Sequence, residues 1–212
     1  MIVKSFPVGL LQCNCTVLGD PKSREAIVVD PGGDPDRILE VVAQHELRVV
    51  RIVHTHAHFD HVHGTHAVRE ATGAEALLHS GDQFLIDGFA DQGKMVGLPM
   101  DLGPAPQIDD GLDDGQEIRF GEGCSLVLHT PGHTPGSVCF SLRTPDGMLL
   151  LSGDTLFKLG VGRTDFPGGS WDQLQTSIRE RLFVLDDDTR VIPGHGPETT
   201  IAYERVNNPF LK

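Results

Sequence analysis

Short runs of aliphatic and β-branched residues, most of them closed by Asp, Gly, His or Pro, recur along the chain and predict β-strands. The runs are NCTVLG, AIVVD, RVVRIVHT, QEIRF, SLVLHT, SVCFSL, MLLLSG and RVIP. Apolar residues at helical spacing predict helices over residues 32–44, about 61–71, 170–182 and 199–206. Asp34 is the expected N-cap ahead of Pro35 in the first helix, and Ser170 and Gln173 fit a capping box in the third.

The order of these elements predicts the fold class. Residues 81–113 are rich in Pro and Gly, and we expect them to be irregular with one short helix. Each half of the chain, before and after this segment, supplies strands for a sheet and helices to cover it. The expected fold is α/β, a four-layer αββα sandwich of two mixed β-sheets face to face with helices outside. No linker divides the chain, so we expect one domain over residues 1–212.

Composition excludes several classes of function. Lys and Arg number 17 against 30 Asp and Glu, and this net charge of −13 repels phosphate backbones and anionic lipid. We therefore expect no nucleic-acid partner and no membrane partner. No apolar run approaches the roughly 18 residues of a membrane helix, and the N-terminus lacks the basic region of a signal peptide. The 4 cysteines form no Cys-x-x-Cys pair and are expected to be reduced, mostly buried thiols of a cytoplasmic protein.

Histidine is the unusual residue of this chain, because six of its 11 histidines lie between residues 54 and 66. The imidazoles of His56 and His58 share a face only in extended chain, so a strand that ends near Thr55 can aim both at one metal ion. Asp60 and His61 follow and can aim at a second ion. Asp60 could instead cap the next helix, and a lone histidine is usually structural. Six histidines in so short a segment argue against that explanation for the whole cluster.

Three further residues of ligand type follow the ends of predicted strands. His133 lies in TPGHTPGS, Asp154 in LLLSGDT and His195 in IPGHGP. Each alone is typical of a turn, but loops at strand ends gather at one edge of a sheet. Together with the histidine cluster they offer enough ligands for two ions and one bridging carboxylate. Nitrogen and oxygen ligands without thiolate suit zinc, and also iron or manganese.

The HxHxDH motif, followed by separate His, Asp and His sites, resembles the metallo-β-lactamase superfamily along essentially the whole chain. The segments SGDTLF, GRTDFPGG, PGHGP and NPFL are similar to the short form of its glyoxalase II-like branch, the hydroxyacylglutathione hydrolases. The resemblance implies a first metal site of His56, His58 and His133, and a second of Asp60, His61 and His195, with Asp154 bridging. It also implies that Asp30 orients a ligand histidine, although Asp30 could instead be a turn residue ahead of Pro31.

The same resemblance implies the reaction. Two divalent ions, with zinc favoured over iron or manganese, would activate a bridging hydroxide to cleave a thioester, most closely S-D-lactoylglutathione or a related hydroxyacylglutathione. Asp60 and Asp154 would be the catalytic residues. Arg163 matches a basic residue that contacts glutathione in the family, unless it forms an ion pair with Asp165, and Lys158 is a looser candidate. Full-length glyoxalase II has a C-terminal helical domain, which is not expected here because only a short segment follows His195.

Other functions stay open at this stage. Persulfide dioxygenases carry GRTDF and the same ligand letters, and the resemblance would then place one Fe(II) on His56, His133 and Asp154, with glutathione persulfide as substrate. A metallo-hydrolase of another class, acting on a lactone, and a non-catalytic metal-binding module are further alternatives. Cleavage of β-lactams is disfavoured because no cysteine stands at a ligand position. A homo-oligomer is compatible with the sequence.

Overall fold

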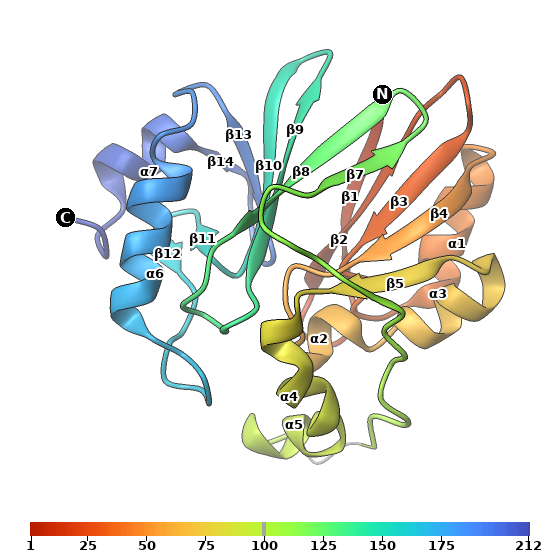
Figure 1. Cartoon of the computed structure of the whole chain (residues 1–212), viewed down its shortest axis with the longest axis horizontal. Helices are drawn as coiled ribbons and strands as arrows, with labels where there is room; N and C mark the ends of the chain where they lie inside the picture. The colour runs from red at the N-terminus through yellow and green to blue at the C-terminus, as the bar shows by residue number, and fades with distance from the viewer. Residues whose placement is uncertain (99–100) are drawn as a thin grey trace.

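The computed structural model describes residues 1–98 and 101–212, and the strands in this part of the chain form two six-stranded mixed sheets that face each other (Figure 1). The first sheet has the order β1-β2-β3-β4-β5-β6. Its strands are β1 (Ile2–Val8), β2 (Cys13–Gly19), β3 (Glu25–Val29), β4 (Arg48–Val53), β5 (Glu75–Leu78) and β6 (Asp110–Gly111). Strands β1 to β3 pair antiparallel, and β3 to β6 pair parallel.

The second sheet has the order β14-β13-β10-β9-β8-β7. Its strands are β7 (Glu117–Phe120), β8 (Gly123–His129), β9 (Val138–Thr144), β10 (Gly147–Gly153), β13 (Arg190–Pro193) and β14 (Thr199–Thr200). All neighbours are antiparallel except β10 and β13, which run parallel and therefore end at the same edge. A small hairpin of β11 (Leu156–Phe157) and β12 (Gly160–Val161) follows β10.

Helices cover both outer faces, which confirms the predicted αββα sandwich (Figure 1). On the first sheet lie α1 (Pro35–Gln44) and α3 (Thr65–Thr72), and on the second lie α6 (Trp171–Ser177), which continues as a π-helical turn (Ile178–Leu182), and α7 (Ile201–Asn207). Three short helices, α2 (Phe59–Val62), α4 (Gln83–Asp87) and α5 (Phe89–Met95), lie together at one end of the sandwich.

Apolar side chains fill the space between the layers as the strand and helix patterns require. Ile27, Phe120 and Phe140 are fully buried between the two sheets. Ile38 packs helix α1 onto the first sheet, and Leu174 packs helix α6 onto the second. These packed layers hold the strand ends, and the loops that leave them, at fixed positions.

The structure differs from the sequence predictions in several elements, and packing explains each. The single helix predicted over 61–71 is two helices, because the chain turns at Gly64, where a Cβ would lie 2.6 Å from the Pro31 carbonyl oxygen. Asp34 stands at the N-cap of α1, but its backbone is left-handed (φ 46°) and its carboxylate accepts the Gly9 amide (2.9 Å) instead of capping the helix. Ser170 caps α6, accepting the Gln173 amide at 3.4 Å, but the other half of the predicted capping box is replaced, because the Ser170 amide donates to the Gly132 carbonyl (2.8 Å).

Residues 81–113 are more ordered than the sequence predicts. Outside residues 99–100, which lie beyond the described part, the segment holds α4, α5 and the short edge strand β6. Strands β1 and β5 were not predicted either, since β1 is a half-exposed edge strand and β5 is only four residues long. The described residues contain no helix long and apolar enough to span a membrane. All four cysteines are free, three of them buried, as expected.

The segment that leads into β6 is held by Asp109. Its carboxylate accepts hydrogen bonds from Arg69 Nε (2.8 Å), Arg69 Nη2 (2.7 Å) and the Ala76 amide (3.0 Å). Its hydrogen bond with Arg69 lowers the pKa of Asp109 from 3.8 to about 2. We expect Asp109→Asn to lower the free energy of unfolding by about 1 kcal/mol at pH 7. Because the folded-state pKa is depressed, the difference from the wild type shrinks as the pH falls from 4 toward 2.

Urea unfolding of both proteins between pH 7 and pH 3 measures this difference. Asp91→Asn is the matched control, because Asp91 forms an exposed pair with Lys94 within one helix. A loss from Asp109→Asn that stays constant over this pH range would contradict the prediction.

Candidate metal centre

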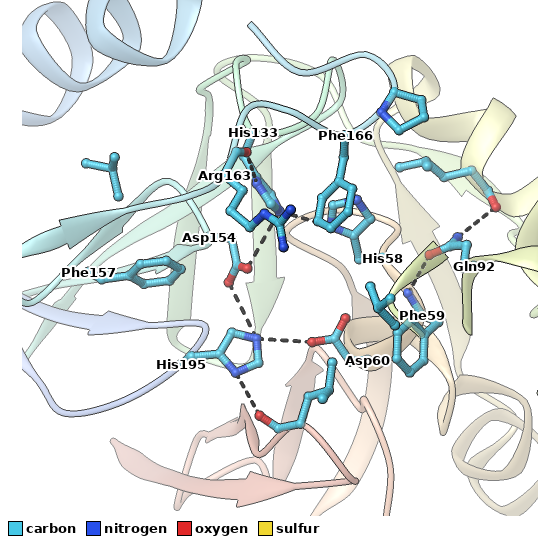
Figure 2. Close-up of a pocket in the computed structure, with 15 residues that line it drawn as sticks. His58, Phe59, Asp60, Gln92, His133, Asp154, Phe157, Arg163, Phe166 and His195 are labelled. Atoms are coloured by element: carbon cyan, nitrogen blue, oxygen red, sulfur yellow. Dashed lines mark hydrogen bonds and ion pairs between the residues drawn. The ribbon is translucent and has the colours of Figure 1, made fainter. Parts of the chain in front are cut away.

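Four segments meet at one edge of the sandwich and carry every ligand candidate that the sequence predicts. Figure 2 shows five of these residues, namely His58, Asp60, His133, Asp154 and His195. His56 and His58 follow β4, and Asp60 and His61 lie in α2. His133 lies between β8 and β9. Asp154 and His195 follow the parallel strands β10 and β13, whose ends are joined by the Gly194 amide and the Gly153 carbonyl (2.7 Å).

His56, His58 and His133 form the first cluster. His58 Nδ1 lies 3.1 Å from His56 Nε2 and 2.9 Å from His133 Nε2. Burial and the neighbouring imidazoles lower the pKa values of His56 and His58, so both rings are neutral and present lone pairs. Tetrahedral ligands at about 2.0–2.1 Å from zinc stand about 3.4 Å apart, close to these spacings. Converging lone pairs in a buried place suit a bound cation.

Asp60, His61 and His195 form the second cluster. His195 Nε2 lies 3.3 Å from His61 Nε2 and 3.1 Å from Asp60 Oδ2. His61 Nε2 lies 3.7 Å from the same carboxylate oxygen. Asp60 is not the helix cap that the sequence left open, because His58 stands at the N-cap of α2 and Asp60 is inside the helix. Its carboxylate therefore faces the two imidazoles instead of the helix backbone.

Asp154 lies between the two clusters. Its Oδ2 is 3.6 Å from His133 Nε2, and its Oδ1 is 3.4 Å from His61 Nε2. Burial raises the pKa of this carboxyl, but the imidazoles, led by His61, outweigh burial and hold the pKa well below its usual range. Oδ1 is buried without a hydrogen-bond partner among the described residues. A buried anionic oxygen normally has a partner, so the donor set fits metal ions on both sides of Asp154.

Oxygen atoms on the outer side of the rings fix which nitrogen faces inward. The Nδ1 atoms of His133 and His195 donate to the carbonyls of Arg163 (2.7 Å) and Leu11 (3.1 Å). His61 Nδ1 donates to Asp30 Oδ2 (3.0 Å). Each of these contacts holds a proton on Nδ1 and directs Nε2 at the cluster.

Asp30 is buried behind His61, with 2% of its surface exposed. Its carboxylate also accepts the amide and the hydroxyl of Thr55, both at 2.7 Å. The Thr55 hydroxyl lies 3.1 Å from His56 Nδ1, so Asp30 reaches one histidine directly and a second through Thr55.

A cavity of about 450 Å³ opens above the clusters, and its floor carries Asp60, Asp154 and His195 (Figure 2). Its walls are largely apolar, with Phe157 beside His195 and Phe166 beside His58. The remaining apolar lining residues are Leu11, Phe59, Leu85, Val96, Val161 and Pro167. The size and lining are those of a small-molecule site.

The two basic candidates are placed differently. Arg163 lines the cavity with its guanidinium over the Phe166 ring (4.2 Å to the centroid). It also pairs with Asp165 at 2.7 and 2.9 Å, which is the ion pair that the sequence offered as the alternative, and contact with a substrate stays a prediction. Lys158 does not line this cavity, and its ammonium lies over Tyr203 in a separate groove.

The other histidines lie outside the clusters, as expected. His54 is fully buried, with contacts to the Leu77 carbonyl (2.9 Å) and the Thr65 hydroxyl (2.8 Å). His79 and His129 stack on each other with ring centroids 4.1 Å apart. His63 is exposed beside Phe89.

Sequence analysis missed two buried polar residues that hold the ligand loops. Gln92 accepts the Phe59 amide (2.8 Å) and donates to the Ala57 carbonyl (3.0 Å). Asp82 accepts the Ala57 amide at 3.0 Å and the Gly136 amide at 2.6 Å. Both belong to the segment that the sequence presents as irregular. The one signal for Asp82 is that Gly81 and Asp82 follow the apolar run at residues 76–78, as a turn at a strand end does.

Comparison with known proteins agrees with this geometry. A family model described as the metallo-β-lactamase superfamily matches residues 8–195. The chain belongs to this superfamily. Among its relatives, a protein of Aquifex aeolicus (strain VF5) is 43% identical over 99% of this chain and 97% of its own length. The hydroxyacylglutathione hydrolase GloC of Haemophilus influenzae is 35% identical over 100% of this chain and 98% of its own length. The probable metallo-hydrolase YqgX of Bacillus subtilis is 38% identical over 98% of this chain and 96% of its own length.

Solved structures of superfamily members share the fold along the whole chain. The BLEG-1 B3 metallo-β-lactamase superposes with a TM-score of 0.87 and 36% identity, covering 99% of both chains. TTHA1623, in a di-iron-bound form, superposes with a TM-score of 0.84 and is 37% identical, covering 97% of this chain and 98% of its own. ETHE1 from Myxococcus xanthus gives 0.77 and 31%, covering 99% and 84%. The chain is thus a member of a metal-binding superfamily, and its relatives include a hydroxyacylglutathione hydrolase and a probable metallo-hydrolase.

Proposed function

We propose that this chain is a metal-dependent thioesterase that hydrolyses S-D-lactoylglutathione or a related hydroxyacylglutathione. The observation that carries the proposal is the pair of ligand clusters joined by Asp154 under a cavity with Arg163 at its wall. The similarity to GloC supports the choice of substrate. His56, His58 and His133 would hold one divalent ion, and Asp60, His61 and His195 a second, with Asp154 between them. Zinc is the expected metal, and iron or manganese accepts the same donors.

When bound, two such ions would supply an activated water and polarise the carbonyl oxygen of the substrate. The chain itself supplies position. The carboxylates of Asp60 and Asp154 line the floor, where Asp60 can accept a hydrogen bond from an attacking water and Asp154 would direct one oxygen at each ion. Phe157 and Phe166 flank the clusters and keep bulk water from the reacting carbonyl.

The leaving group needs little from the protein. A thiolate departs readily, because its conjugate acid has a pKa near 8.5–9. Among the described residues, the side chains that line the cavity include no lysine to protonate a leaving amine, and they do include the Arg163 guanidinium. That guanidinium is placed to attract a glutathione carboxylate, although Asp165 competes for it.

The decisive experiment is release of free thiol from S-D-lactoylglutathione by metal-loaded protein under anaerobic conditions. Turnover that stops when a chelator removes the metal is the expected result. No turnover by metal-loaded protein, with either zinc or iron, would overturn the proposal. Oxygen consumption with glutathione persulfide would then favour the dioxygenase alternative. Hydrolysis of a β-lactam is measured separately, because one solved neighbour bears the name B3 metallo-β-lactamase.

The position of Arg163 predicts a modest effect on substrate binding. We expect Arg163→Ala to raise the KM for S-D-lactoylglutathione about 5-fold with kcat unchanged, because an exposed charge pair is worth up to about 1 kcal/mol. Lys158→Ala is the matched control and should leave KM unchanged, since Lys158 lies against Tyr203. Asp165→Asn should lower KM by releasing the guanidinium. Equal effects of the Arg163 and Lys158 variants would rule out this role of Arg163.

A further inference from the structure

Asp82 is a buried carboxylate that neither the sequence nor the resemblance assigns to the site. It ends the 3₁₀ turn Ser80–Asp82 that follows β5, and its exposed fraction is 0%. No lysine, arginine or histidine pairs with it among the described residues. Its hydrogen-bond partners are instead two backbone amides and one hydroxyl. Burying a charge without an opposite charge is costly, so the position requires a compensating role.

Those partners belong to two ligand loops. Asp82 Oδ2 accepts the amide of Ala57 (3.0 Å), the residue between His56 and His58. The same oxygen accepts the Thr134 hydroxyl (2.8 Å), directly after His133. Asp82 Oδ1 accepts the Gly136 amide at 2.6 Å. One carboxylate therefore joins the loop that carries two histidines of the first cluster to the loop that carries the third.

The surrounding chain is shaped for this contact. A Cβ on Gly136 would lie 2.6 Å from Asp82 Cγ, and a Cβ on Gly81 would lie 3.0 Å from Gly136 Cα. The 3₁₀ turn and the 134–136 loop therefore approach closely only because both positions are glycine. His79 accepts the Gly81 amide (3.1 Å) and holds the turn.

Asp30 makes the corresponding arrangement for the second cluster. Its carboxylate accepts the Thr55 amide and hydroxyl (2.7 Å each) and the Nδ1 proton of His61 (3.0 Å). Two buried carboxylates thus hold the histidine segment at residues two positions apart. Asp30 binds His61 directly, and Asp82 binds the loop that carries His133.

We propose that Asp82 is a positioning residue of the first ligand cluster, where its carboxylate fixes the separation of His56, His58 and His133. It contacts none of these rings directly and acts through Ala57, Thr134 and Gly136. The inference rests on the proposed metal centre, but not on which substrate that centre cleaves. Asp82→Asn keeps one acceptor oxygen and turns an amide group toward a backbone N–H, so at least one tie between the loops is lost.

The test measures metal binding with Co²⁺ and Zn²⁺ alone. Metal-free protein is titrated with Co²⁺ by absorption spectroscopy and with Zn²⁺ against a chromophoric chelator, which separates the two binding steps. His58→Ala identifies the step that belongs to the first cluster, and His195→Ala the step that belongs to the second. We expect Asp82→Asn to weaken the step affected by His58→Ala about 10- to 100-fold and to leave the other step within about 3-fold. Asp30→Asn should weaken mainly the step affected by His195→Ala, because Asp30 contacts His61 directly, and the other step less, because it reaches His56 only through Thr55.

Asp20→Asn is the matched control. Asp20 is 5% exposed, and its carboxylate likewise accepts backbone amides and a hydroxyl, from Lys22, Ser23 and Glu122. It precedes β3, whereas Asp30 follows that strand, so it lies away from the ligand loops. A merely structural role of Asp82 would lower the melting temperature as Asp20→Asn does and leave both metal affinities unchanged.

A second variant covers the case in which Asp82→Asn does not fold. Thr134→Val removes only the hydroxyl that donates to Asp82, and it should weaken the same metal step by a smaller factor. Unchanged affinities in folded Asp82→Asn, or in Thr134→Val if the first variant fails, would overturn the inference. A wild type that binds two ions but cleaves no thioester would defeat the proposed function and leave this inference standing.

Discussion

Asp154→Asn should lower thioesterase activity by about 10³-fold, the equivalent of about 4 kcal/mol of transition-state stabilisation. Asn has the shape of Asp but no charge, and one of its two terminal atoms is a donor that cannot bind a metal. Asp154 is the residue whose two oxygens face His133 and His61, one in each cluster. The substitution therefore affects both ligand sets at once, whereas a change at His58 or His195 affects one.

Thiol release from S-D-lactoylglutathione, metal content per chain and the melting temperature together measure this effect. We expect less bound metal and a melting temperature close to that of the metal-free wild type, because the change keeps side-chain volume. Asp91→Asn, an exposed helix carboxylate, controls for the loss of one negative charge. Activity within tenfold of the wild type in the Asp154 variant would contradict a bridging role.

The candidate ligands could be found from sequence because their signal is local. His56, His58, Asp60 and His61 stand within six residues, where spacing alone shows which side chains share a face of extended chain. His133, Asp154 and His195 follow clear strands, and strand ends gather at a sheet edge. The layers of the fold could also be predicted from local patterns, because each sheet must bury a face and its strands therefore carry alternating or continuous apolar residues.

What sequence could not supply depends on contacts between distant segments. Gly64 divides the predicted helix because the Pro31 carbonyl approaches it, and Asp34 turns away from α1 to bind the Gly9 amide. Asp82 and Gln92 lie in a segment with no strong periodicity, and their partners in the histidine segment, Ala57 and Phe59, are more than 20 residues away. The exclusion of Lys158 from the cavity follows from the β11–β12 hairpin, which directs it toward Tyr203.

A substitution at Gly194, the glycine that precedes His195 in the segment PGHGP, should also have a large effect. A Cβ on Gly194 would lie 2.2 Å from Asp154 Oδ1 and 2.8 Å from His61 Cε1. Two hydrogen bonds hold the backbone there in place. The Gly194 amide donates to the Gly153 carbonyl (2.7 Å), and the Gly194 carbonyl accepts the backbone amide of Asn14 (2.7 Å). In Gly194→Ala the Asp154 carboxylate must therefore move, while the surrounding strands stay in place.

We expect Gly194→Ala to reduce kcat/KM about 10²-fold, since a displacement of about 1 Å in a reacting group has an effect of this size. Its melting temperature should stay within a few degrees of the wild type. Gly160→Ala is the matched control, because its Cβ would meet nothing closer than 3.5 Å, and it should keep full activity. Full activity in Gly194→Ala would mean that the position of Asp154 Oδ1 is unimportant. A large loss with normal folding would place the catalytic requirement at the Asp154 carboxylate, whose two oxygens face one ligand cluster each.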